Sequence, residues 1–289
     1  MKLDDFEAVF RSSVKSRFKL EAPPLGSIMV LTDLPAGEAA ALETRVQEFL
    51  AQSFSGAPGE YLRPSWRTVR DGEYGRVSEM IALISDESPD LIVSYRHLLG
   101  RDKDLLHSLG SFIDTATQAT DIPVLLLPPL SHPDFDRRMK TMDTVLVATD
   151  HIASDQALVN WGVSICPNHG TVVLAHIESE SVFKRYGEII AMIPDADTET
   201  TLARIRKKLL GRPRDYIDSI IAELRAAEID EKVVPVVEMG DTLSDYKRII
   251  DEHDVDLIVM GTKDNNQLAM RGMAYAMAIE LQDRPMLLL

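Results

Sequence analysis

The chain contains the same apolar pattern twice, and this repeat limits the folds that it can adopt. Residues Ser88–Gly100 read SPDLIVSYRHLLG, and residues Asp254–Asn266 read DVDLIVMGTKDNN. Each copy is followed by a stretch with helical spacing and then by a proline-led apolar run, IPVLLLP at Ile122–Pro128 and RPMLLL at Arg284–Leu289. Because self-similarity of this kind marks repeated structural units, we predict two related units in one chain.

Each unit also begins with an apolar run that ends in an aspartate. SIMVLTD closes with Asp33 and DTVLVATD closes with Asp150. These runs are short, rich in β-branched residues and without polar alternation, which predicts buried parallel strands. Amphipathic stretches such as Glu38–Gln52 and Arg214–Glu228 separate the strands. Strands that alternate with helices predict an α/β fold, here with two open parallel sheets flanked by helices.

The two units differ in length. Asp150 and Asp256 are 106 residues apart, whereas Asp33 and Asp90 are only 57 residues apart. The second unit has room for an additional strand, TVVLAHIE at Thr171–Glu178, and for a long helical region. We therefore predict that the first sheet lacks one strand–helix unit and has four strands where the second has five.

These patterns divide the chain into four parts. We predict an N-terminal amphipathic helix over residues 1–24, a truncated domain over 25–130, a linker over 131–140 and a complete domain over 141–289. In the first part an apolar residue recurs every four positions, which is typical of a helix with one apolar face. These residues are Phe6, Phe10, Val14 and Phe18. We expect this helix to cover the face that the missing unit leaves bare.

The charge of the chain excludes several classes of partner. Forty-six acidic and 31 basic side chains give a net charge of −15, which repels nucleic-acid backbones and anionic membrane surfaces. Cys166 is the only cysteine, so no disulfide can form within the chain, as is usual in a reducing cytoplasm. The first residues lack the pattern of a secretory leader, and no apolar run approaches the roughly 18–20 residues of a membrane span. We expect a cytoplasmic protein without nucleic-acid or membrane partners.

Motifs of catalysis and metal binding are missing from the sequence. The seven histidines have no metal-ligand spacing, and Cys166 has no cysteine near it. There is also no G-x-S-x-G elbow, no P-loop lysine and no G-x-G-x-x-G motif. We therefore predict neither catalytic residues nor a metal site.

The order of these elements resembles the universal stress protein family in its tandem form, with two domains in one chain. The resemblance rests on the aspartate that ends the first strand of each unit, the second strand LAHIE, the stretch MGDTLSDYKRIIDEHDVDLIVMGTK and the proline-led final strand. It implies a Rossmann-like sheet of five strands that pairs through its last strand. The runs VLLL and MLLL are then expected to pack together as an intramolecular pseudo-dimer, and a further homodimer is an open alternative.

Many members of this family bind ATP through G-x2-G-x9-G-[ST] after the fourth strand, and the aspartate after the first strand meets the adenosine. Glycines allow the backbone to approach the phosphates, and the N-terminus of the following helix offers unpaired N–H groups. The resemblance therefore makes seven residues candidates for nucleotide binding. They are Asp33, Gly100, Gly110, Ser111, Asp150, Gly261 and Gly272.

The motif is incomplete in both units. In the second, Gly261 stands at the first glycine position, but Asp264 stands at the next and Met273 replaces the hydroxyl residue. A carboxylate beside a triphosphate is repulsive unless a metal bridges the two. In the first, Gly100, Gly110 and Ser111 fit the later part of the motif, but Tyr95 takes the place that matches Gly261.

We therefore expect a non-catalytic, stress-response regulatory or ligand-binding protein with degenerate ATP motifs, whose partner is an unknown protein or small ligand. Two alternatives stay open. One is an ATP-binding switch with weak ATPase or phosphotransfer activity, in which Mg²⁺ enters only with ATP. The other is a binder of a non-phosphate small molecule in the cleft of the second domain, beneath an insertion over residues 179–200 that we predict to form a flap.

Overall fold

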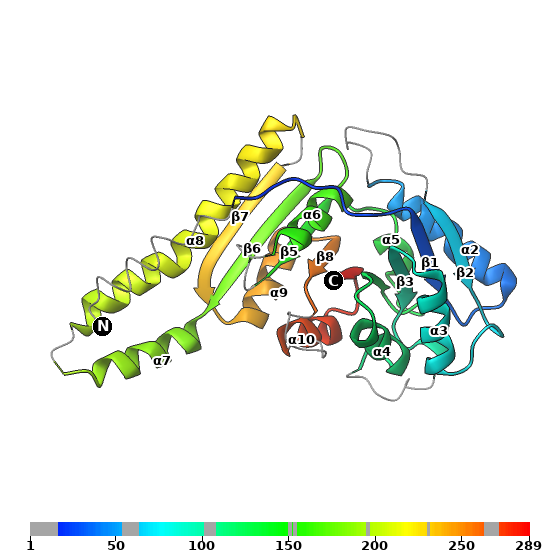
Figure 1. Cartoon of the computed structure of the whole chain (residues 1–289), viewed down its shortest axis with the longest axis horizontal. Helices are drawn as coiled ribbons and strands as arrows, with labels where there is room; N and C mark the ends of the chain where they lie inside the picture. The colour runs from blue at the N-terminus through cyan, green and yellow to red at the C-terminus, as the bar shows by residue number, and fades with distance from the viewer. Residues whose placement is uncertain are drawn as a thin grey trace.

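The computed structural model describes residues 17–53, 64–100, 108–149, 152, 155–194, 197–229, 232–262 and 272–289. These residues form one sheet of nine strands in the order β2-β1-β3-β4-β9-β8-β5-β6-β7, flanked by helices (Figure 1). The strands are β1 (Ser27–Leu31), β2 (Ser65–Val69), β3 (Leu91–Tyr95), β4 (Val124–Leu127), β5 (Thr144–Ala148), β6 (Thr171–Ser179), β7 (Lys232–Gly240), β8 (Leu257–Met260) and β9 (Met286–Leu288). The helices are α2 (Ala36–Leu50), α3 (Val77–Glu87), the 3-10 turn η1 (Leu98–Gly100), α4 (Ser111–Ala119), α5 (Phe135–Arg138), α6 (Gln156–Ile165), α7 (Glu180–Ala191), α8 (Thr198–Ala226), α9 (Thr242–Glu252) and α10 (Gly272–Glu280).

The sheet consists of two parallel parts that follow the same strand order. The second part runs β7-β6-β5-β8-β9 and the first runs β2-β1-β3-β4. β2 therefore lies beside β1 as β6 lies beside β5, and the described residues of the first part contain no further outer strand in the place of β7. β1 pairs directly with β2, from Ser27 opposite Ser65 to Leu31 opposite Val69. The prediction of four strands in the first half and five in the second is confirmed.

The two parts join through their final strands. β4 and β9 pair antiparallel, with Val124 opposite Leu288 and Leu126 opposite Met286. The predicted packing of VLLL against MLLL is confirmed, and the two predicted sheets are two parts of one continuous sheet. Because the strands are parallel within each part, the carboxyl ends of the two parts lie at opposite edges of the sheet.

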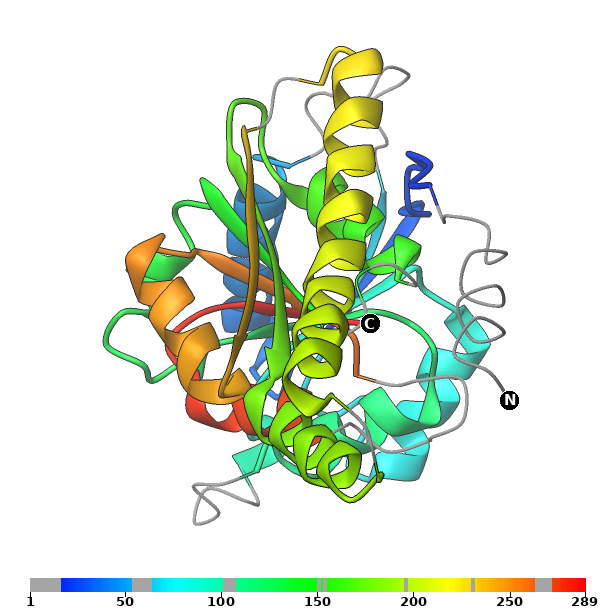
Figure 2. The same ribbon diagram turned by 90° about the vertical axis from the view of Figure 1, so that its left-hand side faces the viewer.

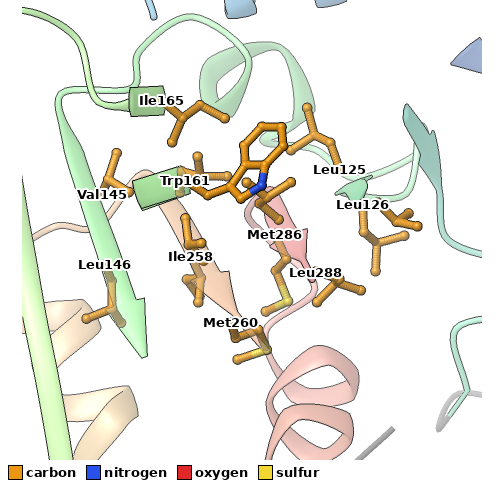
Figure 3. Close-up of a cluster of buried hydrophobic side chains, with 14 of the residues drawn as sticks. Leu125, Leu126, Val145, Leu146, Trp161, Ile165, Ile258, Met260, Met286 and Leu288 are labelled. Carbon is orange, nitrogen blue, oxygen red and sulfur yellow. The ribbon is translucent and has the colours of Figure 1, made fainter. Parts of the chain in front are cut away.

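One hydrophobic core spans this junction. Trp161 of α6 is only 5% exposed, and its indole ring lies beside Leu125 of β4 and Met286 of β9 (Figure 3). Leu125 and Met286 are fully buried. The second half thus supplies a tryptophan that packs on the last strand of the first half.

Buried arginines add polar contacts across the junction. Arg96, which follows β3, donates from Nη2 to the carbonyl oxygen of Leu281 at 3.1 Å. Burial lowers the pKa of Arg96 to about 10, so the guanidinium stays charged at neutral pH. Arg138 of α5 and Arg284 share the carboxylate of Asp283, at 3.0 Å and 2.9 Å. Each half therefore places arginine side chains against the loop that leads into β9.

The N-terminal segment differs from the prediction. Residues 17–24 form no helix, so the helix predicted over residues 1–24 is wrong for this part, and residues 1–16 lie outside the described part of the chain. Phe18 packs edge-on against Tyr216 of α8, with 6.4 Å between ring centroids. The Asn160 side chain of α6 binds the backbone on either side of residue 20, at 3.2 Å and 3.0 Å. Residues 18–21 thus lie on the complete second half, not on the first half as expected, because these tertiary contacts override the helical spacing.

The predicted linker over residues 131–140 is packed against the body of the protein. It contains α5, whose Phe135 is 4% exposed and whose Arg138 is 7% exposed. Arg45 of α2 lies over the Phe135 ring, with 5.5 Å from its Cζ to the ring centroid. These contacts fix the passage between the two halves.

Replacing Leu125 by alanine tests whether the two halves share one core. Because the substitution leaves a cavity at the junction, we expect the free energy of unfolding to fall by about 3 kcal/mol. The chain has one tryptophan in each half, Trp66 in β2 and Trp161 in α6. Fluorescence of Trp66→Phe and Trp161→Phe variants during urea denaturation should give one common midpoint, which Leu125→Ala lowers for both.

A matched control is Leu209→Ala on a partly exposed position of α8, which should cost less than about 1 kcal/mol. Two separate transitions, one for each tryptophan, would show that the halves unfold independently and that the shared core contributes little.

Candidate functional site

The candidate residues of the first half gather at one edge of the sheet. β1 and β3 are neighbouring parallel strands, so their carboxyl ends meet at the same edge, where ligands of open α/β sheets bind. Asp33 follows β1, Gly100 ends η1 shortly after β3, and Gly110 and Ser111 begin α4. The structure thus brings the four predicted residues of this half to one side of the sheet.

The side chain of Tyr95 is hydrogen-bonded to the carboxylate of Asp33. The Tyr95 hydroxyl donates to Asp33 Oδ1 and accepts from the Asp33 backbone N–H at 3.1 Å. It also lies 2.9 Å from the Thr32 hydroxyl oxygen. Burial and then the hydrogen bond to Asp33 raise the pKa of Tyr95, so the phenol remains a donor at neutral pH. The Asp33 carboxylate, for which the family resemblance implies a contact with adenosine, is therefore already hydrogen-bonded to Tyr95 of the same half.

A second tyrosine closes the same corner. Tyr74 is 5% exposed and donates from its hydroxyl to the Thr32 carbonyl oxygen at 3.1 Å. Its ring packs edge-on against Phe112 of α4, with 5.9 Å between centroids. Burial raises the pKa of Tyr74 as well. The end of β1 is therefore held between β3, α4 and the segment before α3.

Backbone geometry accounts for both glycines of this half. Gly100 has φ of 60° and Gly110 has φ of 95°, a region that residues with a Cβ atom rarely adopt. The His97 N–H donates to the Leu109 carbonyl oxygen at 2.9 Å, and the Gly100 N–H donates to the His97 carbonyl oxygen at 2.8 Å. The backbone conformation at Gly100 and Gly110 therefore favours glycine at both positions, whether or not a phosphate binds.

The second half is described only in part at the corresponding edge. Asp150 lies outside the described residues, as does the chain between Thr262 and Gly272. Gly261 follows β8, and Gly272 is the first residue of α10. A Cβ atom on Gly261 would lie 3.6 Å from Asp155 Oδ2. A second carboxylate, which the sequence did not single out, therefore lies near the first glycine of this motif.

The end of β5 is fixed by a buried tyrosine, as the end of β1 is. Tyr246 of α9 is fully buried, and its hydroxyl lies 3.2 Å from the Thr149 carbonyl oxygen and 3.3 Å from that of Ala175. Tyr74 and Tyr246 come from different elements but bind the carbonyl of the threonine that precedes Asp33 or Asp150. The sequence shows both tyrosines but gives no sign of these contacts, which depend on distant elements.

The two incomplete motifs cannot complete each other. Gly100, Gly110 and Ser111 follow strands of the first half, whereas Gly261 and Gly272 follow a strand of the second. Because β4 and β9 are antiparallel, these two groups lie at opposite edges of the sheet.

The insertion over residues 179–200 does not form the predicted flap. α7 begins directly after β6 and, with the start of α8, extends away from the sheet (Figure 1). The strand ends of the second half are therefore not covered by α7.

A hollow of about 430 Å³ lies at the outer edge of the first half, between α2 and β2. Its lining includes Trp66, Arg70 and Glu43. In the second half α8 packs on the corresponding outer strand β7. The hollow thus marks the face from which the missing strand–helix unit is absent.

In the part of the chain that the structure describes, a membrane-spanning helix and a metal-binding cluster are both absent. None of the helices in this part of the chain has the length and hydrophobicity to cross a bilayer. No group of three or more histidine, cysteine or carboxylate side chains within it is arranged to hold a metal ion.

Comparison with protein families identifies the second half. Residues 141–272 match the model of the Universal stress protein family. Residues 141–272 therefore form a domain of the universal stress protein family. No curated protein matched the sequence.

Solved structures share the fold over nearly the whole chain. One is a functionally unknown protein from Pseudomonas aeruginosa, with a TM-score of 0.52 and 16% identity over 92% of this chain and 93% of the other. Another is a candidate universal stress protein from the same organism, with a TM-score of 0.51 and 15% identity over 92% and 94% of the two chains. Since identities this low carry only the fold, the likeness shows a mostly parallel, Rossmann-like α/β architecture.

Replacing Tyr95 by phenylalanine removes the hydroxyl that binds Asp33 and Thr32. We expect the free energy of unfolding to fall by about 1–2 kcal/mol, because a hydrogen bond to a charged group is lost. Urea denaturation measures this change. Tyr186→Phe on the exposed side of α7, where the ring is 43% exposed, removes the same atom from the surface and should have no measurable effect. Equal stabilities of both variants would mean that the Tyr95 contact does not stabilise this corner.

Proposed function

We propose that this chain is a tandem universal stress protein that acts as a non-catalytic regulatory, ligand-binding protein of the stress response. The family match of residues 141–272 supports this function for the second half. The strand order of the first half, which is that of the second with one outer strand fewer, supports a second copy of the same domain.

The hydrogen bond from Tyr95 to Asp33 carries the proposal for the first half. A ribose hydroxyl that took the place of Tyr95 on Asp33 Oδ1 would have to displace a phenol that is 4% exposed and also bound to Thr32. Displacement would leave buried polar groups without partners, at a cost of about 1–3 kcal/mol each. This contact therefore disfavours binding of a nucleoside at Asp33.

The charge near Gly261 supports the same conclusion for the second half. Asp155 is half-buried and lies close to the first glycine of this motif. A triphosphate that approached the Gly261 backbone would meet this carboxylate in a partly desolvated setting, where like charges repel more strongly than in water. The alternative of an ATP-binding switch, with Asp150, Gly261 and Gly272 as its site and Mg²⁺ as its counter-ion, is accordingly the weaker proposal.

Asp155 also favours the other alternative, a non-phosphate ligand in the second half. A carboxylate is a strong acceptor for hydroxyl or amino groups. A small polar molecule with such donors would be attracted to Asp155, whereas a polyphosphate would be repelled by it.

Titration of the purified protein with ATP–Mg²⁺ by calorimetry tests the proposal. We expect no binding tighter than about 1 mM, and no nucleotide when the protein is denatured and its released small molecules are identified by mass spectrometry. The Asp155→Asn variant removes the charge but keeps the shape, so it should bind ATP more tightly than the wild type if Asp155 excludes phosphates.

Micromolar ATP binding by the wild type would contradict the proposal, and two variants would then locate the site. Loss of binding in Ser111→Ala would assign it to the first half, and loss in Asp150→Ala would assign it to the second. Release of a molecule without phosphate would instead support the small-ligand alternative.

A further inference from the structure

Helix α7 and the two residues after its end display a stripe of large apolar side chains to solvent. Val182, Tyr186, Ile189 and Ile193 are between 43% and 54% exposed, and Met192 beside them is 79% exposed. None of the 12 residues of α7, all of which the structure describes, is buried. Scattered apolar residues are common on surfaces, but a contiguous group on one helix marks an interaction site.

The neighbouring side of α7, about 100° around the helix from the stripe, is already in contact with α8. A Cβ atom on Gly187 would lie only 3.2 Å from Leu202 Cδ1, so the two helices approach closely at this point. Phe183 and Ile190 share this side of α7 through helical spacing and are half-buried. α7 is therefore apolar on two sides, and α8 covers only one of them.

The position of α7 leaves its open side accessible. α7 and the first turns of α8 extend away from the sheet in Figure 1 and therefore toward the viewer in Figure 2. A helix of 12 residues is only marginally stable by itself in water. Burial of its second apolar side would stabilise α7 and the start of α8.

We propose that this stripe is a contact surface for a second copy of the same chain, with the two α7 helices packed antiparallel about a twofold axis. The stripe residues are separated by four, three and four positions, which is the spacing of a coiled-coil seam and fits another helix. In an antiparallel pair Val182 faces Ile193 of the other copy, and Tyr186 faces Ile189. A patch that pairs with itself in this way is what a twofold interface requires.

The size of the patch fits a weak dimer. Five side chains exposed by about half provide roughly 500 Å² per copy and about 1,000 Å² in total, which is the lower end for specific interfaces. The charge also fits, because Glu180 and Glu188 balance Lys184 and Arg185 within α7, whereas the chain as a whole carries −15. Two acidic chains therefore meet with little repulsion along this helix.

Sedimentation velocity of the full chain between about 1 and 100 μM, the range in which weak interfaces of this size dissociate, tests the proposal. We expect the wild type to pass from monomer to dimer as the concentration rises. Ile189→Asp should remain a monomer throughout, because it places a charge in the centre of the stripe. Ala191→Asp introduces the same charge at an exposed position on the other side of α7 and should dimerise like the wild type.

A second variant keeps the test valid if Ile189→Asp disturbs α7. Ile193→Lys lies beyond the last residue of α7, so it leaves the helix intact, as far-UV circular dichroism would verify, and should also prevent dimerisation. A wild type that stays monomeric at every concentration would overturn the proposal, as would dimers that persist in both stripe variants.

Binding to vesicles distinguishes a lipid surface from a second copy. The start of α8 is basic, with Arg204, Arg206, Lys207 and Lys208 exposed, which would favour an anionic membrane. We expect no co-sedimentation with phosphatidylserine vesicles. Co-sedimentation that Ile189→Asp abolishes, together with a monomeric wild type, would overturn the proposal and assign the stripe to membranes.

Discussion

The antiparallel pairing of β4 with β9 determines how the rest of this molecule is arranged. It removes one open edge from each half and places Trp161 of the second half on Leu125 of the first. It also reverses the strand direction between the halves. The carboxyl ends of the strands in the first half and those in the second half therefore lie at opposite ends of the strands in the common sheet. Each candidate site must therefore function with the residues of its own half.

The strands could be predicted because their pattern is local and occurs twice. Apolar runs without alternation, and 57 residues in one half against 106 in the other, were enough to indicate four and five strands. The pairing through VLLL and MLLL was implied only by the resemblance to the universal stress protein family. The N-terminal segment was beyond this approach. Phe18 has the spacing of a helical residue, but its place is set by Tyr216, a residue of a distant element.

In the candidate site, too, contacts between distant residues could not be predicted from the sequence. Asp33 and the glycines could be named from their order along the chain, but the bond between Tyr95 and Asp33 joins residues 62 positions apart. It forms only because β1 and β3 are neighbours in the sheet, and no local pattern encodes that contact. The glycines show the reverse problem, since Gly100 and Gly110 fit a phosphate motif but have positive φ angles that explain their presence without a ligand.

The missing unit makes β2 an outer strand, and both ends of the sheet resist further growth. β7 contains Pro235, which has no N–H to offer to an incoming strand. β2 is only five residues long, and its Arg67 is bound to Glu73 and Glu87 at 2.5 Å and 3.1 Å. Short, charged or proline-containing outer strands discourage strand addition from another molecule. Both outer strands of this sheet therefore disfavour pairing with a strand of another copy, even when many copies are present.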